Sequence, residues 1–291
     1  MAIVLGDNRY GKAEVRLVRV DRGTDRHEIT DLNVSVALAG DLADTHLTGS
    51  NDKVLATDTQ KNTVFAFARA GIGAIEDFGL RLARHFVDSQ ASIHRARVRI
   101  DQYSWTRLAV GGAPAPHSFA RAGDGTRTAV LTYDGEHAWA LSGITDLTVL
   151  NSTDSEFWGF PRDQYTTLQE TKDRILATAV TATWRHTTTD AVDWDASFDA
   201  ARTSLLDAFA ATFSHSLQQT LHAMGKRVLT DDPAIAEIRL SLPNKHHFLS
   251  DLTPFGLDNP GEVFYAADRP YGLIEGTVLR DDAPPAGPAW D

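Results

Sequence analysis

The sequence predicts an α+β protein in which an antiparallel sheet is duplicated and helices pack on one face of each copy. Three observations predict this class. Several segments alternate apolar and polar residues, as half-buried strands do. Three other segments repeat apolar residues at helical spacing. The order β-β-α-β-β occurs twice along the 291 residues, although the two copies share a pattern and not identical residues.

The first copy contains four predicted strands, with two helices between the second and the third. The expected ranges are, in order, 13–20, 27–42, 57–71, 75–86, 94–105 and 126–144. Thr57 or Asp58 is a suitable N-cap for the first helix, and Asp134-Gly135 is a dipeptide typical of hairpin turns. Residues 107–121 look less regular than their surroundings, and the sequence assigns them no role.

The second copy repeats this order, with strands expected at residues 147–152, 174–187, 236–242 and 271–280. Its helix, residues 196–228, is predicted to be continuous because one apolar stripe runs along it: Leu206, Phe209, Phe213, Leu217, Leu221, Met224 and Val228. Thr167 and Glu170 fit a capping box, which predicts one helical turn before Arg174.

These elements divide the chain into two repeats, residues 1–144 and 145–280, and a proline-rich tail, 281–291, which is predicted to be disordered. An antiparallel sheet of this kind exposes two edges that can pair with another chain. Closing several such sheets into a barrel would remove the edges. We therefore expect a homo-oligomer.

The amino-acid composition excludes several classes of function. The net charge of −11 disfavours binding to nucleic acid or to an anionic membrane. The absence of cysteine excludes disulfides, cysteine-bound zinc, iron–sulfur clusters and a catalytic thiol. The sequence shows no secretory signal and no apolar run of membrane-spanning length, so a cytoplasmic location is expected.

Two polar segments stand out, and each has an ordinary structural explanation. Residues 241–248, "SLPNKHHF", end a predicted strand. Their ordinary explanation is a polar surface loop. Residues 155–174 group several aromatic side chains, which are costly to expose together, so this segment either packs on the protein or holds a flat ligand. His246 and His247 are adjacent and would point to opposite faces of a strand, so they do not suit a metal site.

Six segments in order, from residue 10 to about 276, resemble the urate oxidase (uricase) family: "YGKAEVR", "ATDTQKNTVFAFA", "SEFWGFPRDQYTTLQETKDRILAT", "LQQT", "SLPNKHHF" and "EVFYAADRPYGLIE". The resemblance implies the tunnelling fold, with two repeats per subunit, paired subunits that form a barrel, and a homotetramer that is a dimer of dimers. It also implies purine degradation by oxidation of urate with O₂ and water to 5-hydroxyisourate and H₂O₂, with no metal and no organic cofactor.

The resemblance also assigns the active site, with its two groups contributed by different subunits at an interface. The first group, which would clamp the purine, is Phe157, Arg174, Leu217, Gln218 and Asn244, and Thr57 and Asp58 of the second group would also contact the substrate. The residues that would handle protons are Lys12, Thr57 and His246. At Leu217 the family uses the backbone amide of an aliphatic residue, so the identity of the side chain should matter little.

These residue types suit an anionic purine. The planar fork of Arg174 can bind a carbonyl and a ring nitrogen in two parallel bonds, Gln218 can read the opposite C=O/N–H edge, and Phe157 offers a face for stacking. Triplet O₂ reacts slowly with closed-shell molecules, so the substrate must first become a better reductant by losing a proton. Lys12, bonded to Thr57, would be the base, with His246 as a third member. Asn244 would hold O₂ or water.

Two alternatives stay open at this stage. Relatives within the fold bind other purines or pterins, often through a glutamate and with zinc, but this chain lacks cysteine and clustered histidines. A purine-binding protein without activity would keep the clamp but not the relay, whereas here the relay residues Lys12, Thr57 and His246 are all present.

Overall fold

The computed structural model describes residues 1–267 and 269–291. It combines α-helices with antiparallel strands, so the predicted α+β class is confirmed. The chain divides into two compact units. The first unit comprises residues 1–143, 184–198 and 284–291, and the second comprises residues 144–183 and 199–283. The first unit therefore includes a segment of the predicted second repeat, residues 184–198, as well as most of the tail.

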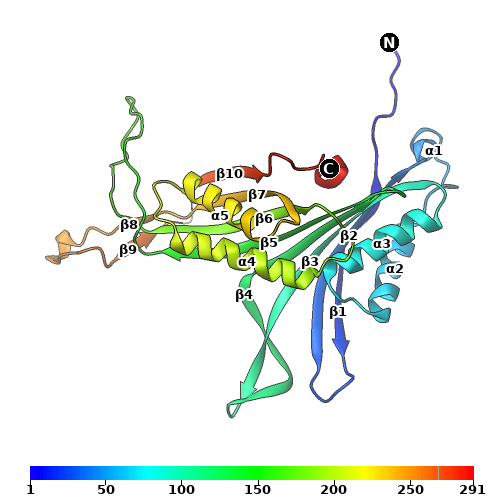
Figure 1. Ribbon diagram of the computed structural model, residues 1–291, viewed down its shortest axis with the longest axis horizontal. Helices are drawn as coiled ribbons and strands as arrows, with labels where there is room; N and C mark the ends of the chain where they lie inside the picture. Colours follow the sequence, from blue (N-terminus) through cyan, green and yellow to red (C-terminus); the bar gives the residue numbers. More distant parts are fainter. Residues whose placement is uncertain (268) are drawn as a thin grey trace. The chain divides into compact units, whose positions relative to one another are not determined.

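Four strands of the first unit hydrogen-bond in the order β1-β2-β3-β4, each antiparallel to the next. Their bounds are β1 (Tyr10–Asp21), β2 (Glu28–Gly40), β3 (Ile93–Val110) and β4 (Ala113–Tyr133). Three helices connect β2 to β3, namely α1 (Ala43–Leu47), α2 (Thr57–Ala70) and α3 (Ile75–Ser89). Helix α2 packs against β1 and α3 against β3 and β4, on one face of the strands as predicted (Figure 1).

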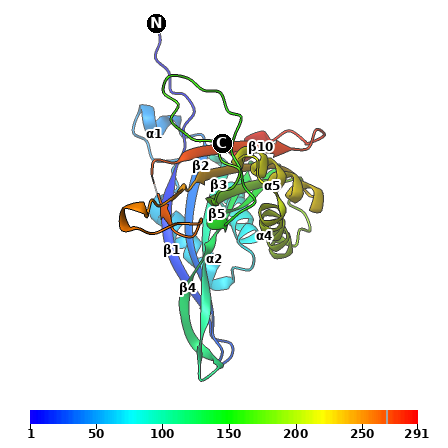
Figure 2. The same ribbon diagram turned by 90° about the vertical axis from the view of Figure 1, so that its left-hand side faces the viewer.

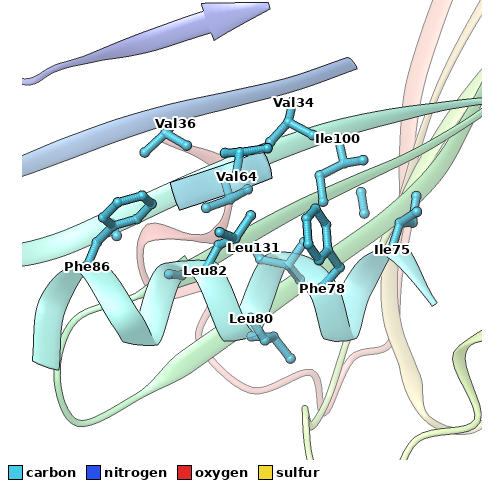
Figure 3. Packing of buried hydrophobic residues seen from close by; sticks show 14 of the residues in the cluster. Val34, Val36, Val64, Ile75, Phe78, Leu80, Leu82, Phe86, Ile100 and Leu131 are labelled. Atoms are coloured by element: carbon cyan, nitrogen blue, oxygen red, sulfur yellow. The ribbon is translucent and has the colours of Figure 1, made fainter. Parts of the chain in front are cut away.

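The core of the first unit lies between these helices and the strands (Figure 3). Val34 and Val36 of β2 and Ile100 of β3 point into it from alternate strand positions. Phe78 and Leu82 of α3 meet them and are fully buried. Burying such a side chain stabilises the fold by about 1.5–3 kcal/mol. The helical periodicity predicted over residues 75–86 is therefore the buried face of α3.

A carboxylate is also buried in the first unit. Glu76 of α3 is fully buried, and its Oε2 lies 2.8 Å from Nη2 of Arg127 on β4. Its Oε1 accepts a hydrogen bond of 2.6 Å from Oγ of Ser142 on β5 (Ala138–Asn151). The Nη1 of Arg127 lies 2.6 Å from Oδ1 of Asp195, in the first turn of α4 (Trp194–Ala211). This network explains why residues 184–198 belong to the first unit. Burial raises the pKa of Glu76, and the attraction of Arg127 opposes this rise.

In the second unit, β6 (Leu176–His186), β7 (Ile235–Asn244) and β10 (Gly272–Leu279) are hydrogen-bonded in that order, and β7 and β10 are antiparallel. Strands β5 and β6 contribute residues to both units. Helix α5 (Leu217–Asp231) packs on β7 and β10 (Figures 1 and 2). Helix α5 lies close to β10, because a Cβ on Gly225 would lie 2.6 Å from Cγ2 of Val278.

A two-stranded antiparallel pair, β8 (His247–Leu249) and β9 (Phe264–Ala266), follows β7, with a 3₁₀ turn, η1 (Thr253–Phe255), between its strands.

The prediction of one continuous helix over residues 196–228 is wrong. Helix α4 ends at Ala211 and α5 begins at Leu217. Between them, Ser214 pairs with Ser155 in an isolated parallel bridge, and the Oγ of Ser216 accepts a hydrogen bond from the amide of Gln219 at 3.2 Å. Ser216 is therefore the N-cap of a new helix. The apolar stripe hid the break because each helix buries its own part of the stripe.

The predicted helical turn at Thr167–Glu170 is absent. Instead, Asp163 Oδ1 accepts hydrogen bonds of 2.9 Å from the amide of Tyr165 and from Oγ1 of Thr166, which makes a side-chain-closed turn. The carboxylate of Glu170 accepts a hydrogen bond from the amide of Gly159 at 3.0 Å. Glu170 of the expected capping box therefore stabilises a long loop and not a helix.

Residues 107–121, which the sequence left irregular, form the end of the long hairpin of β3 and β4. The turn contains Gly111 and Gly112, whose φ angles of 59° and 84° favour glycine. The register shifts between Tyr103 and Trp105 and again between Arg107 and Ala109. These irregularities interrupt the alternation of side chains, which is why no strand pattern is visible in the sequence.

The tail differs from the prediction of disorder. It contains a 3₁₀ turn, η2 (Gly287–Trp290), and Ala289 within it is only 1% exposed. The Nη1 of Arg97 on β3 donates a hydrogen bond of 2.9 Å to the carbonyl of Ala289, and Arg95 forms an ion pair with Asp291 at 3.2 Å. Arginines on the strand therefore hold a segment whose proline content alone indicated disorder.

Candidate active site

The residues expected in the active site fall into two groups, one in each unit. The first unit holds Lys12, Thr57 and Asp58. The second unit holds the other six, which are Phe157, Arg174, Leu217, Gln218, Asn244 and His246. Each group draws on more than one element of its own unit.

Lys12 lies near the start of β1, immediately before a β-bulge. It pairs with Val36 of β2, and the register then shifts between Lys12 and Val15. Glu14, inside this irregular stretch, has a positive φ of 57°. Bulges of this kind re-aim neighbouring side chains and are common beside active sites. The preceding residue must be small, because a Cβ on Gly11 would lie 1.8 Å from the carbonyl oxygen of Val36.

Thr57 is the first residue of α2, and the N-cap is Ala56. The prediction that Thr57 or Asp58 caps this helix is therefore wrong, because the helix begins earlier. The segment before Thr57 is tied to the start of β1, since Oη of Tyr10 donates a hydrogen bond of 3.0 Å to the carbonyl of Leu55. This contact fixes the entry to α2 relative to the strand end that carries the lysine.

Asp58 follows Thr57 on the exposed side of α2. Its carboxylate accepts hydrogen bonds from Lys61 and, at 3.0 Å, from Nδ2 of Asn62. The hydrogen bond from Lys61 lowers the pKa of Asp58, and the positive charge of Lys12 adds a smaller effect in the same direction. Lys12 and Asp58 are thus within electrostatic reach of each other in the first unit.

Phe157 and Arg174 come together at the two ends of the loop that precedes β6. Cζ of Arg174 lies over the ring of Phe157, 5.3 Å from its centroid. Nε of Arg174 donates a hydrogen bond of 3.2 Å to Oγ of the buried Ser155. Among the described residues, the two Nη groups of Arg174 have no hydrogen-bond partner. Burial lowers the pKa of Arg174, which is the direction expected for a cation taken out of water.

Leu217 and Gln218 are the first two residues of α5, so their N–H groups belong to the unpaired first turn of a helix. This end of a helix carries partial positive charge and favours an anion. Leu217 is buried, whereas Gln218 is exposed. In the part of the chain that the structure describes, the side-chain amide of Gln218 has no hydrogen-bond partner, so both its donor and its acceptor are free.

Asn244 and His246 lie where β7 ends. Asn244 is the last residue of β7 and pairs with Gly272 of β10. The next residue, Lys245, donates its amide to the carbonyl of Ala177 on β6 at 2.8 Å. Burial lowers the pKa of His246, and the charges of Arg174 and His247 lower it further. His246 therefore favours its neutral form and is within electrostatic reach of Arg174.

Several residues that support this site were not found from the sequence. Ser155 holds Arg174, and Glu156 is hydrogen-bonded to His215, whose Nδ1 lies 2.6 Å from Oε1 of the carboxylate. Only their positions in the sequence could have indicated them, because Glu156 directly precedes Phe157 and His215 lies two positions before Leu217. Side-chain types as common as serine and glutamate do not stand out in a single sequence.

Within residues 1–267 and 269–291, no three His, Cys, Asp or Glu side chains gather in a way that could hold a metal ion. None of the described helices is long and apolar enough to cross a membrane.

The comparisons with known proteins agree with one another. The sequence model of the family described as "Uricase" matches residues 8–132 and 140–275. The uricase of Arthrobacter globiformis is 54% identical over 288 residues, which is 99% of this chain and 94% of that protein. The uricase of Aspergillus flavus is 38% identical, over 94% of this chain and 95% of that protein.

A solved structure gives the same result. The crystal structure of the Arthrobacter globiformis uricase superimposes with a TM-score of 0.94, covering 100% of this chain and 99% of that chain at 54% identity. The fold is thus that of the α+β enzymes with the tunnelling fold, as predicted. The chain belongs to the uricase family, and it is an oxidoreductase of purine catabolism, a urate oxidase that acts on urate and O₂.

Proposed function

We propose that this urate oxidase converts urate, O₂ and water into 5-hydroxyisourate and H₂O₂ without a metal or an organic cofactor. Two electrons pass from urate to O₂, which takes up two protons and leaves as H₂O₂, and the oxygen of water is added to the purine. The enzyme works as a homotetramer, a dimer of barrel-forming dimers. Each active site lies at a subunit interface and joins the first unit of one subunit to the second unit of another.

The arrangement of Arg174 over Phe157 is the observation that carries this proposal. Urate is a flat anion, and Arg174 presents two Nη groups that have no hydrogen-bond partner among residues 1–267 and 269–291, from a guanidinium held at Nε by Ser155. Such a fork can bind a carbonyl oxygen and a ring nitrogen at once. Phe157 stacks on the purine, the amide of Leu217 binds it at the helix end, and Gln218 reads the opposite edge.

The proton relay consists of Lys12, Thr57 and His246. Lys12 removes a proton from urate through the hydroxyl of Thr57, with Asp58 beside it, and the resulting dianion gives up electrons to O₂ more readily. The lowered pKa of His246 supports a neutral imidazole that can accept a proton. Asn244, the last residue of β7, holds O₂ or water above the purine ring.

The placement of these groups supports a site shared between subunits. The relay residues Lys12 and Thr57 belong to the first unit, whereas the purine clamp belongs to the second. Strands β1 and β10 are at the two ends of the strand order, so each leaves backbone groups for another chain. Pairing of such edges between two subunits would close a barrel.

The test is a combined assay of urate and O₂ in metal-depleted, aerated buffer. The enzyme is first dialysed against a strong chelator. The proposal predicts that activity survives dialysis, that urate and O₂ disappear in equal amounts, and that H₂O₂ accumulates in the same amount. Activity that is lost on dialysis and restored by a divalent metal would contradict the cofactor-independent mechanism.

A further inference from the structure

We propose that Glu156 and His215 are positioning residues that set the spacing between the two halves of the urate clamp. The inference rests on the proposed function, because it takes Phe157, Arg174 and Gln218 as the clamp. One half of this clamp is carried by the loop before β6 and the other by the first turn of α5.

The two halves meet at a short backbone joint. Ser155 and Ser214 form a parallel bridge. The amide of Ser214 donates to the carbonyl of Asp154 at 2.8 Å, and the amide of Glu156 donates to the carbonyl of Ser214 at 2.8 Å. Phe157 directly follows this joint on one of the two bridged segments. On the other segment, α5 begins three residues after Ser214, so the joint lies immediately before both halves of the clamp.

The side chains of Glu156 and His215 join the same two segments a second time. Oε1 of Glu156 lies 2.6 Å from Nδ1 of His215. The amide of His215 also donates a hydrogen bond of 2.8 Å to Oε1 of Gln219, which anchors His215 to the first turn of α5. A hydrogen bond from Trp158 is the main cause of a lowered pKa of Glu156, to which His215 and the charge of Lys172 contribute. The carboxylate is therefore charged and fully engaged at neutral pH.

The pair is suited to orienting the clamp and not to holding the fold together. The His215 side chain is 64% exposed and that of Glu156 is 12% exposed, so solvent screens the contact on the imidazole side and limits its contribution to the free energy of unfolding. A clamp that binds two edges of one rigid purine is sensitive to the distance between its halves, and a displacement of about 1 Å is enough to weaken it. Releasing the pair should therefore weaken urate binding more than it weakens the fold.

The experiment measures the Kd for urate in the absence of O₂, so that binding is separated from chemistry. The variants are His215→Ala, which removes the bond, and His215→Asn, whose Nδ2 can replace Nδ1 as the donor. His222→Ala is the matched control, because His222 is another exposed histidine close in sequence, which lies on α5 and away from the joint. Arg174→Ala is the reference for the clamp itself. KM, kcat and the thermal midpoint are measured for each variant.

We expect His215→Ala to raise Kd and KM by about threefold to tenfold with kcat within about twofold of wild type. His215→Asn should restore most of the affinity, and His222→Ala should leave it unchanged. An unchanged Kd in His215→Ala, or a thermal shift with no change in Kd, would overturn the positioning role while Arg174→Ala still weakened binding. If Arg174→Ala also left Kd unchanged, the clamp assignment would fail first, and this inference with it.

Discussion

The guanidinium of Arg174 lies over the ring of Phe157, with Cζ 5.3 Å from the ring centroid, while its Nε is bonded to Ser155 at 3.2 Å. Three constraints thus fix the plane of the guanidinium: the covalent chain, the hydrogen bond and the aromatic face. A preoriented fork loses little freedom when a ligand binds, which favours affinity. The same constraints make a lysine a poor replacement.

Arg174→Ala should mainly weaken urate binding. A hydrogen bond to a charged group contributes roughly 1.5–3 kcal/mol, so KM should rise at least about tenfold. Arg174→Lys should not restore KM, because an ammonium group lacks the planar fork and cannot occupy the place over Phe157 in the same way. Steady-state kinetics of urate oxidation provide the measurement, and an unchanged KM in either variant would remove Arg174 from the clamp.

The acid limb of the pH–activity profile should lie below pH 6.5, the ordinary pKa of histidine. Burial, and then repulsion from Arg174 and His247, keep His246 neutral to a lower pH than in the unfolded chain. Protonation as the pH falls should therefore stop the relay. The measurement is kcat/KM between about pH 5 and 8 for wild type and His246→Asn.

The free energy of unfolding should depend on pH in the same direction as activity. In the window below 6.5, the unfolded chain binds more protons at His246 than the folded chain, so stability falls as the pH is lowered through that window. His246→Asn should lose less stability than wild type as the pH is lowered through this window. An acid limb above pH 6.5 that persists in His246→Asn would show that another group controls the reaction.

Arg127→Leu should destabilise the first unit strongly. It would leave the fully buried carboxylate of Glu76 without its cation, and breaking a buried pair from one side typically costs about 3–5 kcal/mol. The double variant Arg127→Leu/Glu76→Gln should be more stable than Arg127→Leu alone, since no buried charge is then left uncompensated. Thermal unfolding of the three proteins is the measurement.

The pH dependence of Arg127→Leu provides a control. Burial raises the pKa of Glu76 in the folded chain, and losing Arg127 removes the attraction that opposes this rise. The variant should therefore recover stability relative to wild type as the pH falls toward the ordinary glutamate value of 4.5, where the carboxyl can be neutral. A deficit that does not depend on pH would indicate lost packing and not an uncompensated charge.

The sequence predicted β1, β2, α2 and α3 well because their alternation of apolar and polar residues or their helical spacing matches the burial of their side chains. It failed where a side chain satisfies the backbone locally. Ser216 caps a new helix inside the apolar stripe, and Glu170 bonds the amide of Gly159 where a capping box was expected. It also failed for the tail, where Arg97 on a distant strand donates a hydrogen bond to the carbonyl of Ala289.

For the candidate site, sequence motifs indicated the residues that we propose to contact urate but not the residues that hold them in place. The spacing that places Arg174 over Phe157 depends on Ser155 and on the joint with Ser214, and pairing between segments so far apart leaves no local pattern. The roles of the site residues, the tetramer and the cytoplasmic location stay predictions.

Mixing two variants, assayed at a urate concentration at which each is nearly inactive alone, tests the composite active site most directly. Thr57→Ala damages the part of the proposed relay that the first unit carries, and Arg174→Ala damages the proposed clamp, which the second unit carries. If each site joins two subunits, a mixed dimer contains one site with both defects and one with neither. Random reassembly should then recover about a quarter of wild-type activity, assuming independent sites in symmetric dimers. If no activity appears although subunit exchange is confirmed, the assignment of these two groups to different subunits is contradicted.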